Sequence, residues 1–242
     1  MRYAIVSDVH SNIEALDAAL NLLKPDDKLW CLGDIVGYGP NPNECVGKIK
    51  DRASLVVMGN HDLAAIDNFG IEWFNSAAAE AIRWTQGVLS KESGDWLNTL
   101  GYEQREKDFL LVHGAPKPDY FDYVLDKDGA RRAFEATDAT LIFIGHTHIA
   151  ETYALAPDGS IAHRSFQHGG EIELDGSNRY IVNVGSVGQP RDLNPLASFG
   201  FYDEGLRKVE IVRFEYPIAA VQEKIACAHL PPVLARRLTM GR

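Results

Sequence analysis

The chain has 242 residues, of which 45% are apolar and 24% charged, and this globular mixture excludes a disordered or fibrous protein. Its formal net charge is −10 and its Lys and Arg residues form no block, so we expect no stable complex with a nucleic-acid polymer. The three cysteines lie far apart, which excludes a disulfide framework and a CxxC metal site. We therefore predict a single domain over residues 1–242, with its cysteines as buried thiols in a reducing compartment.

The N-terminal segment predicts a strand, a loop and a helix. The apolar run from Tyr3 to Val6 stops at Ser7-Asp8 and is too short for a secretory signal or a membrane span. We therefore expect a cytoplasmic protein without a membrane partner. From Asn12 onward the apolar residues take helical spacing, at Ile13, Leu16, Leu20 and Leu23.

A buried strand that ends in a polar motif recurs along the first part of the chain. The later apolar runs and their motifs are Leu29 to Leu32 before Gly33-Asp34, Leu55 to Met58 before Gly59-Asn60-His61-Asp62, Phe109 to Val112 before His113-Gly114, and Leu141 to Ile144 before Gly145-His146-Thr147-His148. In open α/β sheets, ligands bind just beyond the carboxyl ends of the strands. We therefore expect these motifs to meet in space.

Three further regions complete the domain. Residues 63–108 predict a helical insertion, with helices at Ser76 to Thr85 and Ser90 to Leu100, which serves either as packing or as a lid. After His148 the apolar period shifts to two, which indicates a second, largely antiparallel sheet. Its expected strands are Thr152 to Ala156, Ile161 to Phe166, Tyr180 to Val184, Phe199 to Tyr202 and Leu206 to Phe214. Residues 217–242 return to helical spacing and predict a C-terminal helical tail on the outside of the domain.

The polar residues of the motifs have the chemistry of metal ligands. Imidazoles, carboxylates and one amide suit Mn, Fe, Zn, Ni or Mg, and the lack of cysteine argues against a structural zinc site. A single catalytic metal takes only about three or four protein ligands, so two divalent ions that share a carboxylate are the economical arrangement. The candidate ligands are Asp8, His10, Asp34, Asn60, His113, His146 and His148.

Taken together, the motifs closely resemble the five blocks of the calcineurin-like metallophosphoesterases. The resemblance extends from Met1 to about Asp203, and it includes the turn at Asn183 to Val187 and Gln189-Pro190-Arg191, as in small bacterial and archaeal phosphodiesterase-like members. It implies an α/β fold of the four-layer αββα type, in which two mixed β-sheets are flanked by helices. It also implies a hydrolase for phosphodiesters or phosphomonoesters, including nucleotides.

The resemblance also distributes the ligands between two ions. One ion is assigned to Asp8, His10, Asp34 and His148, and the other to Asp34, Asn60, His113 and His146, so that Asp34 bridges them. A hydroxide between the ions is then expected to attack phosphorus. His61 is the candidate general acid, since the ions do not use it, and Asp62 is expected to orient its ring and raise its pKa. The alternative for His61 is a residue that only satisfies a turn.

Three residues are candidate contacts for a small phosphorylated substrate, and each has a structural alternative. Arg191 suits a phosphate through its fork of donors, but it also suits a surface salt bridge. Asn12 is expected either to hydrogen-bond a phosphate or to cap the N-terminus of a helix. Tyr120, with its neighbours Phe121 and Tyr123, is expected either to stack on a nucleobase or to pack in the core.

Two competing functions remain at this point, and the oligomeric state is left open. A Ser/Thr-type protein phosphatase would share the same core, but the chain offers no separate docking segment for a protein substrate. A catalytically silent scaffold with the same fold would be expected to lack several of the ligands, all of which are present here.

Overall fold

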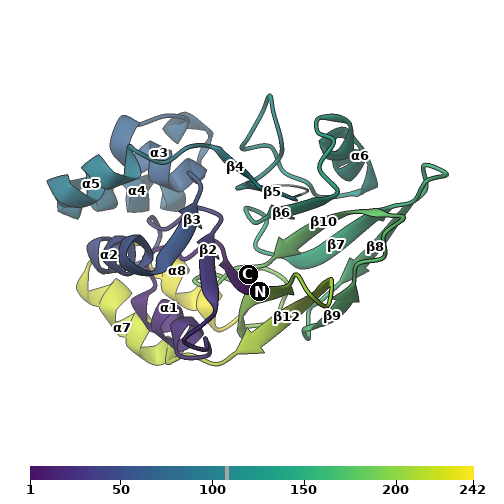
Figure 1. Ribbon diagram of the computed structural model, residues 1–242. Coiled ribbons are helices and arrows are strands. Elements are labelled where there is room, and N and C mark those ends of the chain that lie inside the picture. The colour runs from purple at the N-terminus through teal and green to yellow at the C-terminus, as the bar shows by residue number, and fades with distance from the viewer. Residues whose placement is uncertain (107–108) are drawn as a thin grey trace.

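The computed structural model describes residues 1–106 and 109–242, and its strands form two six-stranded mixed sheets that lie face to face (Figure 1). The first sheet has the order β3 (Ala53–Val56), β2 (Lys28–Cys31), β1 (Arg2–Val6), β11 (Ala197–Asp203), β12 (Lys208–Phe214) and β9 (Gly170–Glu173). The second has the order β4 (Glu103–Glu106), β5 (Phe109–Val112), β6 (Leu141–Ile144), β10 (Arg179–Val184), β7 (Ala150–Leu155) and β8 (Ile161–Ser165).

Helices cover the outer face of each sheet. The first sheet is covered by α1 (Ile13–Leu20), α2 (Pro42–Arg52), α7 (Ile218–Cys227) and α8 (Pro232–Leu238), and the second by α6 (Lys127–Glu135) (Figure 1). Beside α2 lie α3 (Asn60–Asp67), the short 3-10 helix η1 (Ile71–Trp73), α4 (Ser76–Val88) and α5 (Lys91–Leu97). None of the helices in the described part of the chain is long and apolar enough to cross a membrane.

The apolar core divides into three parts, one for each interface between layers. Trp30, Phe143 and Val182 lie between the two sheets, Leu16 and Leu234 lie between the first sheet and its helices, and Phe134 lies between the second sheet and α6. Strands covered on both faces read as unbroken apolar runs, as in the fully buried β5 and β6. The four-layer αββα arrangement that the resemblance implied is therefore confirmed.

The strands after His148 differ from the sequence prediction, because they do not form one sheet of their own. Strands β7, β8 and β10 join β5 and β6 in the second sheet, whereas β11 and β12 join β1 in the first. After crossing to the first sheet at β9 and back to the second at β10, the chain changes sheets for the last time between β10, which pairs parallel with β6, and β11, which pairs antiparallel with β1. Alternation identifies the two faces of a strand but not its neighbours, so it could not reveal this crossover.

The predicted helical insertion packs on the domain over most of its length. Ala81 and Ile82 in α4 and Leu97 in α5 are fully buried, and Trp84 and Trp96 pack against the core at their edge. Trp73 is different, because 73% of its surface is exposed. Residues 107–108 of the predicted 63–108 insertion lie outside the described residues.

Candidate metal centre

The motif loops converge where the two sheets meet. Those after β1, β2 and β3 come from the first sheet, and those after β5 and β6 come from the second. The predicted ligands Asp8, His10, Asp34, His146 and His148 all have positive φ, between 49° and 66°. Such backbone conformations are uncommon for residues other than glycine, and they gather at functional sites.

The glycines of the motifs let the loops approach one another. A Cβ on Gly59 would lie 2.1 Å from Oδ1 of Asp34, and a Cβ on Gly145 would lie 1.9 Å from Oγ of Ser7. Both distances are far inside van der Waals contact, so each glycine leaves room for the neighbouring loop. The motif glycines therefore have a steric role in bringing the ligands together.

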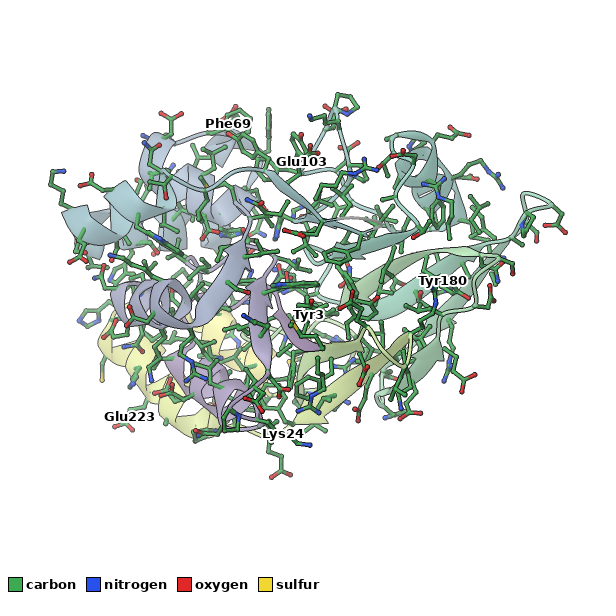
Figure 2. All side chains as sticks on the ribbon, in the orientation of Figure 1. Tyr3, Lys24, Phe69, Glu103, Tyr180 and Glu223 are labelled. Carbon is green, nitrogen blue, oxygen red and sulfur yellow. The ribbon has the colours of Figure 1, made fainter. Side chains whose placement is uncertain are left out.

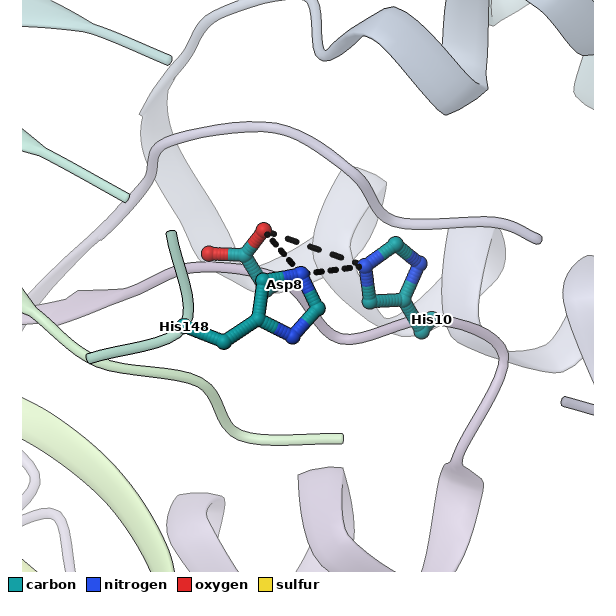
Figure 3. Close-up of side chains that lie close together, drawn as sticks. All are labelled: Asp8, His10 and His148. Carbon is teal, nitrogen blue, oxygen red and sulfur yellow. Dashed lines mark hydrogen bonds and ion pairs between the residues drawn. The ribbon is translucent and has the colours of Figure 1, made fainter. Parts of the chain in front are cut away.

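The first group of donors contains Asp8, His10 and His148 (Figure 3). Nε2 of His148 lies 3.2 Å from Oδ1 of Asp8 and 3.1 Å from Nε2 of His10. Nδ1 of His10 donates to the Val36 carbonyl and Nδ1 of His148 to the Gln189 carbonyl, at 3.1 and 2.6 Å, because a carbonyl can only accept. Both Nε2 atoms then carry lone pairs that face each other, an arrangement that suits a cation between them.

The second group of donors lies around His113. Its Nε2 is 3.0 Å from Nδ1 of His146, 3.1 Å from Oδ1 of Asn60 and 3.3 Å from Oδ2 of Asp34. Its Nδ1 donates to the Leu32 carbonyl at 2.8 Å, which orients the ring toward the group.

Asp34 lies between the two groups. Its Oδ2 is 3.5 Å from Nε2 of His10 and 3.3 Å from Nε2 of His113, while its Oδ1 accepts the backbone N–H of His61 at 2.8 Å. The same oxygen therefore faces both groups, as a bridging ligand must. The structure brings all the predicted ligands together, and their Asp and His donors form clusters that could hold divalent metal ions.

Charge couples the buried carboxylates to the imidazoles around them. Burial alone would raise the pKa values of Asp8 and Asp34, but His148 beside Asp8 and His113 beside Asp34 outweigh it and lower both. Burial alone would lower the pKa of His113, but Asp34 outweighs it and raises that pKa to about 9. In the metal-free protein His113 therefore keeps a proton, which a bound cation would displace.

His61 lies beside the first group, but its environment differs from the prediction. Its ring packs 4.8 Å from that of His10, 4.4 Å from Tyr38 and 4.6 Å from Phe74, between ring centroids. Burial lowers the pKa of His61 to about 4, so the expected rise in pKa was wrong. Nδ1 of His61 has no hydrogen-bond partner within the described residues.

Asp62 does not orient the His61 ring as predicted. Its Oδ1 accepts the backbone N–H of Val36 at 3.0 Å and its Oδ2 accepts that of Gly59 at 3.1 Å. Burial, with a contribution from Asp34, raises the pKa of Asp62 to about 7. Asp62 thus ties the Asp34 loop to the Asn60 loop through the backbone, which orients ligands and not the candidate acid.

The predicted substrate contacts have three different outcomes. Asn12 caps α1, because its Oδ1 accepts the N–H of Ala15, while its Nδ2 donates to the Gly188 carbonyl. Arg191 makes no ion pair with any described carboxylate, which removes the salt-bridge alternative. The hydroxyl of Tyr120 donates to Glu103 at 3.1 Å, and its ring faces Tyr102.

Arg237, in the C-terminal tail, lies beside this centre although no sequence motif marks it. Its Nη1 donates to Oε1 of Gln189 at 3.1 Å, and its guanidinium lies 5.9 Å from the centre of the Tyr38 ring. Arg237 is in no motif and is distant in sequence from every ligand. The one local signal for its position was the pair of adjacent arginines, Arg236 and Arg237, in a short amphipathic segment. Such a pair is equally typical of a helix face that is exposed to solvent.

Comparison with known proteins agrees with this site. The sequence profile of the calcineurin-like phosphoesterases matches residues 1–150. An uncharacterized protein of Methanocaldococcus jannaschii is 42% identical over 99% of this chain and 98% of its own length. The crystal structure of a metallophosphoesterase from Sphaerobacter thermophilus, 38% identical, covers 100% of this chain and 99% of its own, with a TM-score of 0.88.

A more distant relative carries a functional name. A symmetrical bis(5′-nucleosyl)-tetraphosphatase of Actinobacillus pleuropneumoniae is 28% identical over 74% of this chain and 65% of its own length. The profile match, the full-length relatives and the convergent Asp and His donors agree with one another. The chain therefore belongs to the calcineurin-like phosphoesterases, a family of metal-dependent hydrolases.

Proposed function

We propose that the chain hydrolyses phosphodiester or phosphoanhydride bonds of nucleotides at a centre of two divalent ions. The main support for this proposal is the position of Asp34 Oδ2. It lies 3.5 Å from Nε2 of His10 on one side and 3.3 Å from Nε2 of His113 on the other. When bound, two divalent ions would supply an acidified water as nucleophile and positive charge for the phosphoryl oxygens. The negative charges of the buried Asp8 and Asp34 carboxylates favour the binding of cations at this site.

His61 is the proposed proton donor for the leaving group. In the metal-free protein its pKa of about 4 keeps the ring neutral at neutral pH. A phosphate anion in contact with the ring would raise that pKa, because an opposite charge favours the protonated form. We therefore propose that His61 takes up its proton together with the substrate and gives it to the departing oxygen.

An aromatic pocket beside the second group of donors supports a nucleotide substrate. It has a volume of about 410 Å³, and its lining includes Phe69, Trp73, Tyr102, Tyr120 and Phe121. The Phe121 ring lies 6.3 Å from that of His113, between centroids. In Figure 2, Phe69 and Glu103 lie on the same upper side of the molecule, and Glu103 accepts the hydrogen bond from the Tyr120 hydroxyl. Such rings suit a planar base, and the distant relative named as a bis(5′-nucleosyl)-tetraphosphatase favours the same class.

Asp34→Asn and His113→Ala test the metal centre. Each should lower turnover of a chromogenic phosphodiester by several orders of magnitude, since each removes a donor beside the proposed bridge. Metal content per chain should fall in parallel, from two ions in the parent protein loaded with Mn, Fe, Zn, Ni or Mg. Asp51→Asn, at an exposed carboxylate, is the matched control and should change neither quantity. Full turnover in a metal-depleted Asp34→Asn variant would contradict the proposal.

His61→Ala separates proton donation from packing. A donor matters most for a poor leaving group, so turnover of a nucleoside diester should fall about 10²- to 10⁴-fold, and turnover of a nitrophenyl ester much less. Rates are compared at saturating substrate with metal content held equal. Equal losses for both esters would assign His61 to structure alone. Fastest turnover of a phosphopeptide by the parent protein would instead favour a protein phosphatase.

A further inference from the structure

Two arginines near the metal centre share the neutral partners Gln189 and Tyr38. Nη2 of Arg191 donates to Oε1 of Gln189 at 2.8 Å, and Nη1 of Arg237 donates to the same oxygen at 3.1 Å. Both guanidinium groups lie over the Tyr38 ring, at 5.5 and 5.9 Å from its centre. Two positive charges from distant parts of the chain are thus held together by an amide oxygen and a ring face.

The arginine pair lacks a counter-ion. Asp192, the carboxylate next to Arg191 in sequence, is bound to Arg213. Within residues 1–106 and 109–242, neither Arg191 nor Arg237 forms an ion pair, and both are only partly exposed. Burial and the adjacent Arg191 charge lower the pKa of Arg237. Two neighbouring cations without an anion repel each other, and a bound anion would reverse that cost.

The pair borders the first group of donors directly. The backbone N–H of Arg191 donates to the His148 carbonyl at 3.2 Å, and the Gln189 carbonyl accepts from His148 Nδ1 at 2.6 Å. The Tyr38 ring beneath both arginines lies 4.6 Å from that of His10, between centroids. An anion on the arginine pair would therefore be a close neighbour of a phosphate on the ions.

Helix α8 holds Arg237 in place. Leu234 and Leu238 on this helix are buried in the core beneath the first sheet, and Gln222 of α7 donates to the Ala235 carbonyl at 2.8 Å. Arg236, one residue earlier, is exposed to solvent. The tail therefore does more than cover the sheet, because it presents one selected guanidinium to the centre.

We infer that Arg191 and Arg237 form a subsite for a second phosphate group, so that the preferred substrate carries a chain of phosphates and not a single one. This inference rests on the proposed function for the position of the first phosphate. The aromatic pocket contacts the His113 side of the centre and the arginine pair the His10 side. A nucleotide with its base in the pocket would therefore extend its phosphate chain across the ions toward α8.

Binding of two non-hydrolysable ligands tests the subsite. Methylphosphonate carries one phosphoryl group and methylenediphosphonate carries two, and calorimetry at a fixed free Mn²⁺ concentration would measure both on the metal-loaded protein. Arg237→Gln should weaken methylenediphosphonate binding about 10- to 100-fold, the loss expected for a charged hydrogen bond, and leave methylphosphonate within about 2-fold. Arg237→Lys should recover only part of the affinity, since an ammonium lacks the planar fork.

Arg236→Gln is the matched control on the same helix, and it should leave both affinities unchanged. The melting temperature and metal content of each variant are measured, so that a displaced helix is recognised. Equal weakening of both ligands, or no weakening of either, would overturn the subsite. Because binding needs no turnover, a chain that keeps the difference between the ligands but hydrolyses no nucleotide would refute the proposed function and retain the subsite.

Discussion

Backbone strain at the metal centre is concentrated in the ligand residues themselves. A residue other than glycine in the left-handed region costs about 1–2 kcal/mol, so five such ligands need support from their surroundings. That support comes from loop-to-loop bonds, since Asp8 N–H donates to the Gly33 carbonyl at 3.1 Å and His10 N–H to the Asp34 carbonyl at 2.9 Å. The two loops hold each other in shape before any cation arrives, which preorganises the donors.

Gly145→Ala should disturb the centre without unfolding the domain. The new Cβ would lie 1.9 Å from Ser7 Oγ and 2.6 Å from Asp8 Oδ2, so the loops after β1 and β6 must separate. We expect metal content and turnover to fall sharply while the circular dichroism spectrum stays unchanged. Gly47→Ala in α2, where a Cβ meets nothing within 4 Å, is the control and should be neutral or slightly stabilising. Normal metal binding by Gly145→Ala would contradict the steric role of this glycine.

At the scale of elements, the first sheet is anchored at the point where β1 meets the turn before β2. Nε of Arg2 donates to Oδ1 of Asp27 at 2.8 Å, and the guanidinium lies 4.0 Å from the centre of the Phe201 ring on β11. One arginine thus ties three neighbouring segments of the sheet that carries the Asp8 and Asp34 loops.

Asp27→Asn should destabilise the fold in a pH-dependent way. The bond from Arg2 lowers the pKa of Asp27 in the folded protein. A lowered carboxyl pKa contributes stability above the unfolded value of about 3.9, and that stability is lost as the pH falls through the folded value. Urea unfolding should show a loss of about 1 kcal/mol at pH 7. The loss should vanish near pH 2, and it should be absent at both pH values in Asp26→Asn, at an exposed carboxylate. A loss that persists at low pH would exclude the charge as its cause.

Local patterns predicted the elements better than the partners of those elements. The polar residues at the ends of apolar strands were recognised because strand and motif are adjacent in sequence, as with Leu141 to Ile144 before His146. The sheet that β11 joins and the position of Arg237 beside the metal centre depend on contacts between segments that are distant in sequence. The spacing of residues along the chain carries no information on such contacts. Asp62 was misassigned for the same reason, since its partner Val36 lies on another loop.

At the scale of the whole molecule, the metal centre connects the two sheets and the last helix. Its donors come from both sheets, and its border includes the last helix. Stripped of cations, the interior keeps two buried carboxylates and a cluster of imidazoles close together. Bound ions should therefore stabilise the entire domain and not only the loops.

Removal of metal should lower the melting temperature of the parent protein. A ligand at about 100 times its dissociation constant adds about 2.7 kcal/mol of stability. For a domain of this size, each kcal/mol corresponds to about 2–4 °C, which gives a shift of about 5–10 °C. Scanning calorimetry with and without a chelator measures the shift, and Asp34→Asn should show almost none. A parent protein that melts at the same temperature in chelator would contradict a structural contribution from the ions.

The pairing of β1 with β11 also sets an order of events during synthesis. The Asp8 loop is synthesised long before β1 can be paired on both edges, because β1 lies between β2 and a strand that begins only at Ala197. Until that late strand is made, one edge of β1 stays open and Gln189, which positions His148, has only just appeared. We expect the nascent chain to bind its cations only after β11 has been synthesised and has paired with β1.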